Sequence, residues 1–213
     1  MASEVRRPAA GNGAVQLAAL LDGAKAMRAE FNHAMRDASG ALLDESSGWM
    51  AWQRPGNFRW EVLQPLAQTL LINGDVFYQY DRDLEQLIVA PVSPQVSALP
   101  NVLLAGDVAA INQQYEVEAI YAVATDAGED AKPVQAGQLA GQARLFKLTP
   151  RHSDGLFTAI VVEFAQSQIA AIDIEDDLQQ TSRFEFSASS PLDKNTDALF
   201  AIDPAPGTEI IHQ

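Results

Sequence analysis

Residues able to carry out acid–base, nucleophilic or metal chemistry are sparse in this chain. Its 213 residues include no cysteine and three histidines, which are His33, His152 and His212. None of the histidines lies in a catalytic motif with serine or aspartate, and no two have the helical spacing of metalloprotease ligands. Without cysteine there are no disulfides, no thiol catalysis and no cysteine-bound zinc. We therefore predict no enzyme activity, no catalytic residue, no metal site and no cofactor.

Acidic side chains outnumber basic ones by 28 to 14, which gives a net charge of −14. This charge repels phosphate backbones and anionic lipid headgroups, so we expect no nucleic acid partner. The densest acidic run is Asp173-Ile174-Glu175-Asp176-Asp177. It lacks the spaced oxygen ligands and the glycine of an EF-hand loop, so we interpret it as a solvated turn between strands.

Large apolar side chains recur at a spacing of two residues. All three tryptophans lie between Trp49 and Trp60, and Phe58, Trp60 and Val62 alternate with charged residues. This alternation is typical of a strand with one apolar face. The apolar set is larger than one sheet face usually needs, so it forms either an ordinary core or a pocket for an apolar ligand. The candidates for lining such a cavity are Phe31, Met35, Trp49, Phe58, Trp60, Leu70, Ile72, Leu103 and Leu104.

The elements that position these side chains are mostly strands. Residues 1–13 are small and polar and are expected to be disordered, so residues 14–213 form the single predicted domain. Leu17, Leu20, Leu21 and Met27 recur at helical spacing and predict an amphipathic helix. Asn73-Gly74 between apolar runs predicts a type I′ hairpin. Leu99–Ala105 is expected to form a short apolar helix, and Thr125–Gly141 a loop.

The two-residue period predicts about ten strands, which imply one large antiparallel sheet that must curl or close. The later strands are expected at Gln114–Val123, Ala143–Leu148, Phe157–Phe164, Gln168–Ile174, Gln179–Ser187 and Ala198–Ile202.

Several segments resemble one family, the periplasmic lipoprotein carriers called LolA. The most specific segments are Arg54-Pro55-Gly56-Asn57-Phe58-Arg59-Trp60 and Asn73-Gly74-Asp75-Val76-Phe77-Tyr78-Gln79-Tyr80-Asp81. Further similarity lies in Leu99–Leu104, Asp177–Phe186 and Phe200–Ile210. The resemblance covers roughly Leu17–Ile211, and it rests on the order and spacing of these segments.

The resemblance implies a mainly β fold with short helices: an unclosed, half antiparallel β-barrel of ten to eleven strands under a helical lid. It implies a monomeric periplasmic chaperone that binds the acyl chains of lipoproteins released from an inner-membrane ABC transporter and delivers them to an outer-membrane acceptor. Arg54 would be the lid latch, Phe58 would keep transfer one-directional, and Leu17–Met27 with Asn101–Ala105 would be lid pieces. It also favours a mature sequence in which Met replaces a signal peptide.

Other interpretations stay open. A sensor or accessory domain could use the same half-barrel to bind lipid without transport. The outer-membrane acceptor of the same pathway shares the fold, but it is anchored through a lipidated cysteine that this chain lacks. Without the resemblance, Arg54 would be interpreted as a solvent-exposed arginine at the end of a strand.

Overall fold

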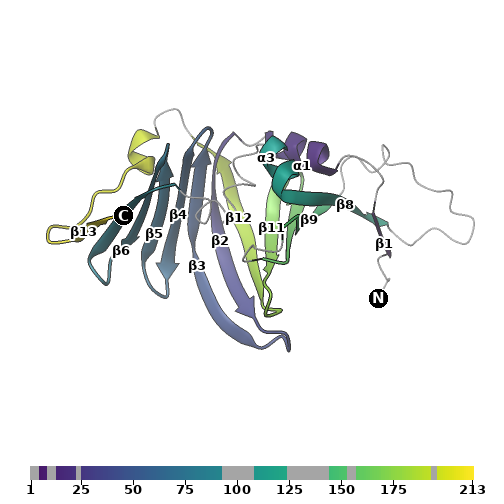
Figure 1. The fold of residues 1–213 in the computed structure, drawn as a ribbon, viewed down its shortest axis with the longest axis horizontal. Coiled ribbons are helices and arrows are strands. Elements are labelled where there is room, and N and C mark those ends of the chain that lie inside the picture. Colours follow the sequence, from purple (N-terminus) through teal and green to yellow (C-terminus); the bar gives the residue numbers. More distant parts are fainter. Residues whose placement is uncertain are drawn as a thin grey trace, which may run out of the picture.

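The computed structural model describes residues 5–8, 13–22, 25–92, 108–123, 144–152, 157–192 and 196–213. In this part of the chain the strands form a single thirteen-stranded sheet with the order β1-β8-β9-β10-β11-β12-β2-β3-β4-β5-β6-β7-β13. The sheet is strongly curved, and two helices lie near one of its edges (Figure 1). Its two edge strands, β1 and β13, are not paired with each other in the described part, so the barrel is unclosed as predicted.

The strands are β1 Val5–Pro8, β2 Ala26–Arg36, β3 Leu42–Gln53, β4 Asn57–Gln64, β5 Gln68–Asn73, β6 Val76–Asp81, β7 Gln86–Pro91, β8 Tyr115–Val123, β9 Arg144–Pro150, β10 Ala159–Ala165, β11 Gln168–Glu175, β12 Thr181–Pro191 and β13 Glu209–His212. The helices are α1 Gly13–Asp22, α3 Val108–Gln114 and the short 3-10 helix η3 Asp197–Phe200.

Strand register divides the side chains of the sheet between two faces. Trp60 on β4 stands opposite Met50 on β3 and Leu70 on β5, whereas Glu61 stands opposite Trp49 and Thr69. Directly opposed residues share a face, because side chains alternate along a strand. We call the face that carries Trp60 and Met50 the inner face, and the face that carries Trp49 and Glu61 the outer face.

The hydrophobic core lies on the inner face. It unites buried side chains from both halves of the sheet with Leu17 and Leu21 of α1 and Ile111 of α3. Helix α1 packs against β8 and α3. Gly13 at its start lies so close to the backbone of Val117 that a Cβ atom would overlap the carbonyl oxygen. The helix therefore covers the β8 end of the inner face at close range.

The C-terminal segment crosses the outer face. Phe200 of η3 packs with Ala51 and Leu71 in a second, smaller apolar cluster that also includes the partly buried Trp49 and Tyr78. The chain then runs to β13, which pairs in parallel with β7. Figure 1 shows this segment at the opposite side of the molecule from α1 and α3.

Several expectations need correction at the level of single elements. The segment expected to be disordered contains β1, which pairs with β8. Met27 belongs to β2 and not to a helix, because α1 ends at Asp22. The strand expected at Ala198–Ile202 is absent, and residues 197–200 form η3. The predicted helix at Leu99–Ala105 and the loop Thr125–Gly141 lie outside the described residues.

The hairpin at Asn73-Gly74 is confirmed, but its turn differs in detail. Asn73 pairs with Val76, so the two loop residues are Gly74 and Asp75. Positive φ occurs at Gly74 and not at Asp75, which is the pattern of a type II′ turn.

No helix in the described part of the chain is long and apolar enough to cross a membrane.

Candidate functional site

An aromatic cluster forms the centre of the inner face. The Phe31 and Trp60 rings stack with their centroids 4.2 Å apart, and Phe184 meets Trp60 edge-on at 5.3 Å. The His33 ring stacks on the Phe184 ring, with their centroids 4.3 Å apart. Phe58 lies 6.3 Å from Trp60. Phe31 and Phe58 are buried, whereas Trp60 and Phe184 are only partly buried, so the cluster presents part of its surface away from the core.

A small cavity lies between α1 and the sheet in the described part of the chain. This cavity of about 20 Å³ is lined by side chains of α1, β2, β3, β12 and the β10–β11 region, among them Leu20, Met27 and Trp52. A space of this size holds about one water molecule. An acyl chain can therefore enter between α1 and the sheet only if these elements separate.

Most of the predicted cavity residues lie on the inner face. Phe31, Phe58 and Ile72 are buried, and Trp60 and Leu70 pack against the core with partial exposure. On α1, Leu17 and Leu21 are buried and Leu20 is partly buried. Met35 is on the same face of β2 as Phe31 but lies near the end of the strand, outside the core cluster. Leu103 and Leu104 lie outside the described residues.

The assignment of Trp49 to the cavity is wrong. Trp49 stands opposite Glu61 and so belongs to the outer face, where it packs with Ala51, Leu71 and Phe200. The guanidinium of Arg28 lies 4.5 Å from the centre of its ring. Large side chains occur at positions 49, 50 and 52, so the sequence of β3 alone does not show which of its two faces is the inner one. Pairing with β4 places Met50 and Trp52 on the inner face and Trp49 on the outer face.

The outer face also holds a buried charge network that the sequence did not predict. Glu61 is only 3% exposed, and its carboxylate accepts hydrogen bonds from Arg59 Nε at 2.9 Å and from Thr69 Oγ1 at 3.0 Å. Arg82 forms an ion pair with the other oxygen. Alternating charged residues are ordinary in a strand sequence, and the sequence does not show that Glu61 contacts Thr69 and Arg82, because these contacts join different elements of the sheet.

The same network holds the C-terminal segment. Arg59 Nη1 donates to the carbonyl oxygens of Leu199 and Ala201, both at 3.0 Å. The side-chain amide of Asn73 donates to the carbonyl oxygen of Phe200 at 3.0 Å. Arg59, flanked by Glu61, therefore links β4 to a segment about 140 residues further along the chain.

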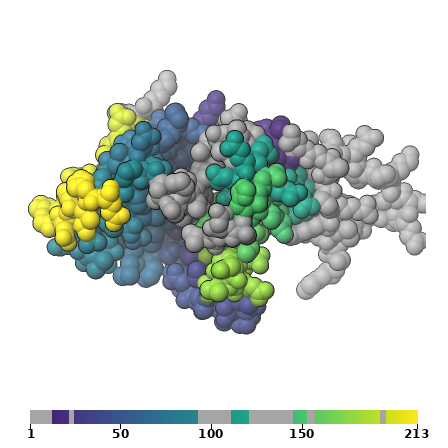
Figure 2. Space-filling model, viewed as in Figure 1, coloured from purple at the N-terminus to yellow at the C-terminus, as the bar shows by residue number. Residues whose placement is uncertain are grey.

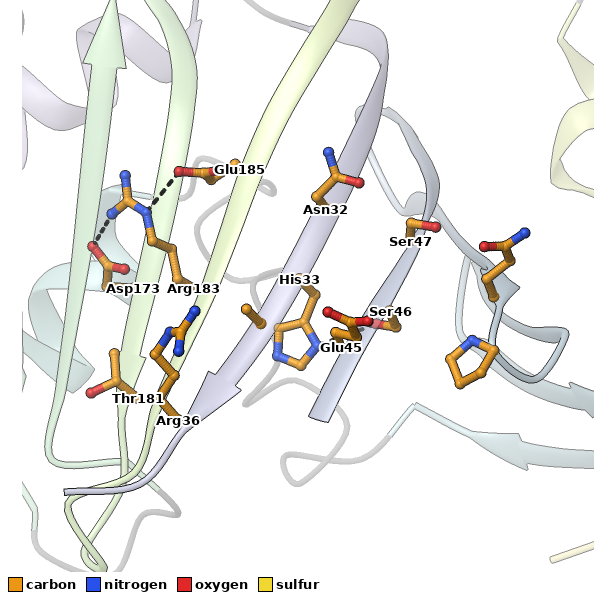
Figure 3. A pocket seen from close by; sticks show the side chains of 13 residues that line it. Asn32, His33, Arg36, Glu45, Ser46, Ser47, Asp173, Thr181, Arg183 and Glu185 are labelled. Atoms are coloured by element: carbon orange, nitrogen blue, oxygen red, sulfur yellow. Dashed lines mark hydrogen bonds and ion pairs between the residues drawn. The ribbon is translucent and has the colours of Figure 1, made fainter. Parts of the chain in front are cut away.

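A polar groove of about 850 Å³ lies on the outer face beyond the C-terminal segment. Figure 3 shows Asn32, Ser47 and Glu45 on two neighbouring strands and Arg183 at one side, with its ion pairs to Asp173 and Glu185. Burial lowers the pKa of Arg183, but hydrogen bonds to Glu185 and Asp173 outweigh it and raise the pKa overall. Arg183 is thus fully paired. Two further lining residues contact each other, since His33 Nδ1 lies 3.2 Å from Ser46 Oγ.

The profile of the family described as "Outer membrane lipoprotein carrier protein LolA" matches residues 22–203. The chain belongs to the LolA family. The outer-membrane lipoprotein carrier protein of Hahella chejuensis is 33% identical over 202 residues, which are 94% of this chain and 88% of that protein. The protein of the same name from Chromohalobacter salexigens is also 33% identical, over 82% of this chain and 74% of its own.

Solved structures show the same fold. An uncharacterized conserved protein from Thermus thermophilus superposes with a TM-score of 0.56 at 11% identity, covering 95% of this chain and all of that one. At this identity the likeness supports the architecture alone. The half-barrel predicted from the resemblance to the LolA family is therefore confirmed, with thirteen strands in place of the ten to eleven expected.

The residues that the LolA resemblance singled out lie at one turn of the sheet. Arg54 follows β3 in the turn to β4, where its backbone N–H donates to the carbonyl oxygen of Lys25 at 2.9 Å. Phe58 is the second residue of β4 and points into the core on the inner face. Lys25 immediately precedes β2, so this turn lies beside the connection that joins α1 to the sheet.

Proposed function

We propose that this protein is a periplasmic carrier that holds the acyl chains of outer-membrane-directed lipoproteins between α1 and the inner face of the sheet. Membership of the LolA family supports this function. The single structural observation that carries it is the aromatic inner face, where Trp60, Leu70 and Phe184 stay partly exposed beside a fully buried core.

The energetics favour a site that is closed when empty. Each buried CH₂ group contributes about 0.8 kcal/mol, so enclosing two or three long acyl chains would release tens of kcal/mol. Reversible binding cannot use that much free energy. Separating α1 from the sheet exposes Leu17 and Leu21, which are fully buried, and the cost offsets part of the gain. The closed inner face therefore lowers the affinity to a level from which cargo can be released.

We assign the latch role to Arg54 and a role in one-directional transfer to Phe58. Arg54 lies in the turn beside Lys25, next to the connection between α1 and β2, where a side chain can influence how easily α1 separates. The proposed partners are an inner-membrane ABC transporter that releases the lipoprotein and an outer-membrane acceptor that receives it. The carrier acts as a monomer.

A release assay tests the carrier function. Spheroplasts with newly made outer-membrane-directed lipoprotein are incubated with the purified protein, and the medium is analysed for a soluble one-to-one complex. We expect release that depends on the protein. Folded protein that releases no lipoprotein from spheroplasts of its own species would contradict the proposal.

The latch is tested by Arg54→Leu in the same assay followed by transfer to the acceptor. We expect the variant to take up cargo and to hand over at least ten-fold less of it, because the open form becomes easier to reach. Lys147→Leu is the matched control, since Lys147 is an exposed cation on β9, in the other half of the sheet. Transfer by Arg54→Leu at the wild-type rate would disprove the latch.

A further inference from the structure

Exposed leucines are concentrated in the turns of the sheet. Of the eight large apolar side chains that are exposed in the described part of the chain, six are leucines in or beside four turns. They are Leu42 and Leu43 after the β2–β3 turn, Leu63 and Leu66 at the β4–β5 turn, Leu84 in the β6–β7 turn and Leu178 in the β11–β12 turn. The other two are Val15 on α1 and Ile210 on β13.

Strand register places these four turns at the same end of the sheet. Arg36 at the end of β2 pairs with both Leu42 and Thr181, which brings the β2–β3 and β11–β12 turns together. Ser47 pairs with Gln64, and Gln68 pairs with Asp81, which continues the row to the β4–β5 and β6–β7 turns. Figures 1 and 2 show the β2–β3 and β11–β12 hairpins projecting together from the lower side of the molecule. We call this row of leucines the leucine rim.

The opposite end of the sheet differs. The β3–β4, β5–β6 and β10–β11 turns carry no exposed large apolar residue in the described part of the chain. Single exposed apolar residues are ordinary on protein surfaces, but a set gathered at one end marks an interaction surface. The segregation of the leucines to one end therefore calls for an explanation by function.

The side chains of Leu84 and Leu178 do not hold their turns in shape. The Asp81 carboxylate accepts the backbone N–H of Leu84 at 3.0 Å, and the Asp176 carboxylate accepts that of Leu178 at 2.9 Å. These bonds involve backbone atoms, so they fix the turns whatever side chains positions 84 and 178 carry. Leu66, Leu84 and Leu178 are 66%, 71% and 67% exposed, which leaves their side chains little part in folding.

The charge around the leucine rim selects the kind of partner. Exposed carboxylates lie in or beside the same turns, among them Asp44, Asp83, Glu85 and Asp177, and they outnumber the exposed arginines there, Arg36 and Arg82. Together with the net charge of −14 they repel an anionic membrane surface and a second copy of this chain. A protein surface that offers apolar pockets bordered by lysine and arginine satisfies both the leucines and the carboxylates.

We propose that the leucine rim is the docking surface for such a protein partner, in addition to the acyl-chain site on the inner face. The inference rests on the proposed function, because the partners to test are the ABC transporter and the outer-membrane acceptor. The rim lies at the end of the sheet away from the turn that contains Arg54. A partner bound to the rim therefore leaves that turn uncovered.

The experiment compares wild type with the triple variant Leu66→Ser/Leu84→Ser/Leu178→Ser. Binding to the detergent-solubilised transporter and to the purified soluble domain of the acceptor is measured by biolayer interferometry at two salt concentrations. We expect the variant to bind at least one of them ten-fold or more weakly. The matched control is Val15→Ser/Ile210→Ser, which removes exposed apolar side chains elsewhere and should bind like wild type. Urea unfolding shows whether each variant is folded.

A second variant addresses the charge. Asp83→Asn/Glu85→Gln/Asp177→Asn leaves every leucine in place. We expect it to slow association several-fold at low salt and to differ less from wild type at high salt, because exposed charges act mainly through long-range attraction. Equal affinities of the wild type and the leucine variant for both partners would overturn the proposal.

Three further measurements separate the alternatives. Binding of a synthetic triacylated peptide reports the acyl-chain site, and the leucine variant should match wild type there. If wild type does not bind this peptide, the proposed carrier function is contradicted, independently of whether the leucine rim binds a partner. A loss of peptide binding in the leucine variant would place the rim in the ligand site and overturn its role in docking. Leucine-dependent binding to anionic or zwitterionic vesicles, or leucine-dependent self-association in sedimentation, would likewise overturn it.

Discussion

The inner and outer faces of the sheet use the same strands in different ways. On the inner face, side chains from both halves of the sheet merge into one apolar surface with an aromatic centre. On the outer face, a small apolar cluster is held beneath the C-terminal segment by hydrogen bonds and ion pairs centred on Glu61. Apolar contact is not directional, whereas a charge network requires one geometry. The two covers therefore differ in how they are held: α1 packs on the inner face through buried apolar side chains, whereas directional bonds tie the C-terminal segment to the outer face.

The largest effect is expected from Glu61→Ala. Removing the carboxylate leaves the largely buried Arg59 without its ion-pair partner, which should lower the free energy of unfolding by about 3–5 kcal/mol. Urea unfolding measures the change. The control is Glu163→Ala, which breaks the 3.5 Å ion pair with the half-exposed Arg183 and should cost less than about 1 kcal/mol. Similar losses for the two variants would show that the outer face does not depend on its buried charge.

The second effect separates the two faces by ligand binding. Trp60→Ala removes a partly exposed ring from the inner face and should weaken binding of a triacylated peptide at least ten-fold. This corresponds to about 1.4 kcal/mol. Trp49→Ala removes the same side chain from the opposite face, where it packs beneath the C-terminal segment, and should leave this affinity unchanged. Fluorescence titration gives both values, and a loss with Trp49→Ala equal to that with Trp60→Ala would contradict the assignment of the faces.

A smaller effect is expected where the C-terminal segment is held. Asn73→Ala deletes the hydrogen bond to the carbonyl of Phe200 and should cost about 1 kcal/mol. Hydrogen exchange in residues 196–213 should speed up while exchange in α1 stays the same. Asn32→Ala, in the polar groove of the outer face, serves as the control. Faster exchange in α1 as well would mean that the covers of the two faces are coupled.

The smallest effect concerns the pH dependence of the inner face. Burial lowers the pKa of His33 from its usual 6.5, and the nearby charge of Asp44 only partly opposes this. Its Nε2 atom is buried without a hydrogen-bond partner in the described structure. As the pH falls through 6.5, His33 binds a proton in the unfolded chain but not yet in the folded protein. The free energy of unfolding therefore falls with pH until the pH reaches the lowered pKa of His33 in the folded protein.

His33→Asn should therefore flatten the fall in stability between pH 7 and pH 5. Urea unfolding at several pH values across this window measures the slope. His152→Asn, an exposed histidine, should follow the wild-type curve. A wild-type slope in His33→Asn would assign the pH dependence to other groups.

The sequence predicted the sheet well because two-residue periodicity and hairpin turns are local signals. Gln168–Ile174 matches β11 closely, and the alternation at Phe58, Trp60 and Val62 placed the inner face of β4 correctly. The resemblance to the LolA family supplied what local signals do not, namely that the sheet stays unclosed.

The errors arose where the outcome depends on partners distant in the sequence. Trp49 was misplaced because only pairing with β4 decides its face. Residues 197–200 form a 3-10 helix because the segment packs on β4 and β5, which strand propensity cannot show. The buried Glu61 likewise contacts Thr69 on β5 and Arg82 in the β6–β7 turn, which lie 8 and 21 residues further along the chain. Met27 was assigned to a helix because its spacing from Leu20 fits one, although the chain has already entered β2.

The two outermost strands bear on how an open sheet of this width limits the addition of another chain. An open edge offers a row of free backbone groups to which another chain can add. Here each edge strand has four residues: β1 reads Val-Arg-Arg-Pro and β13 reads Glu-Ile-Ile-His. Short length, charge and proline are the features by which natural sheets prevent such addition. The longer strand β7 is shielded because β13 lies along it. A half-barrel whose two edges are not paired with each other is thus protected against strand addition at both margins.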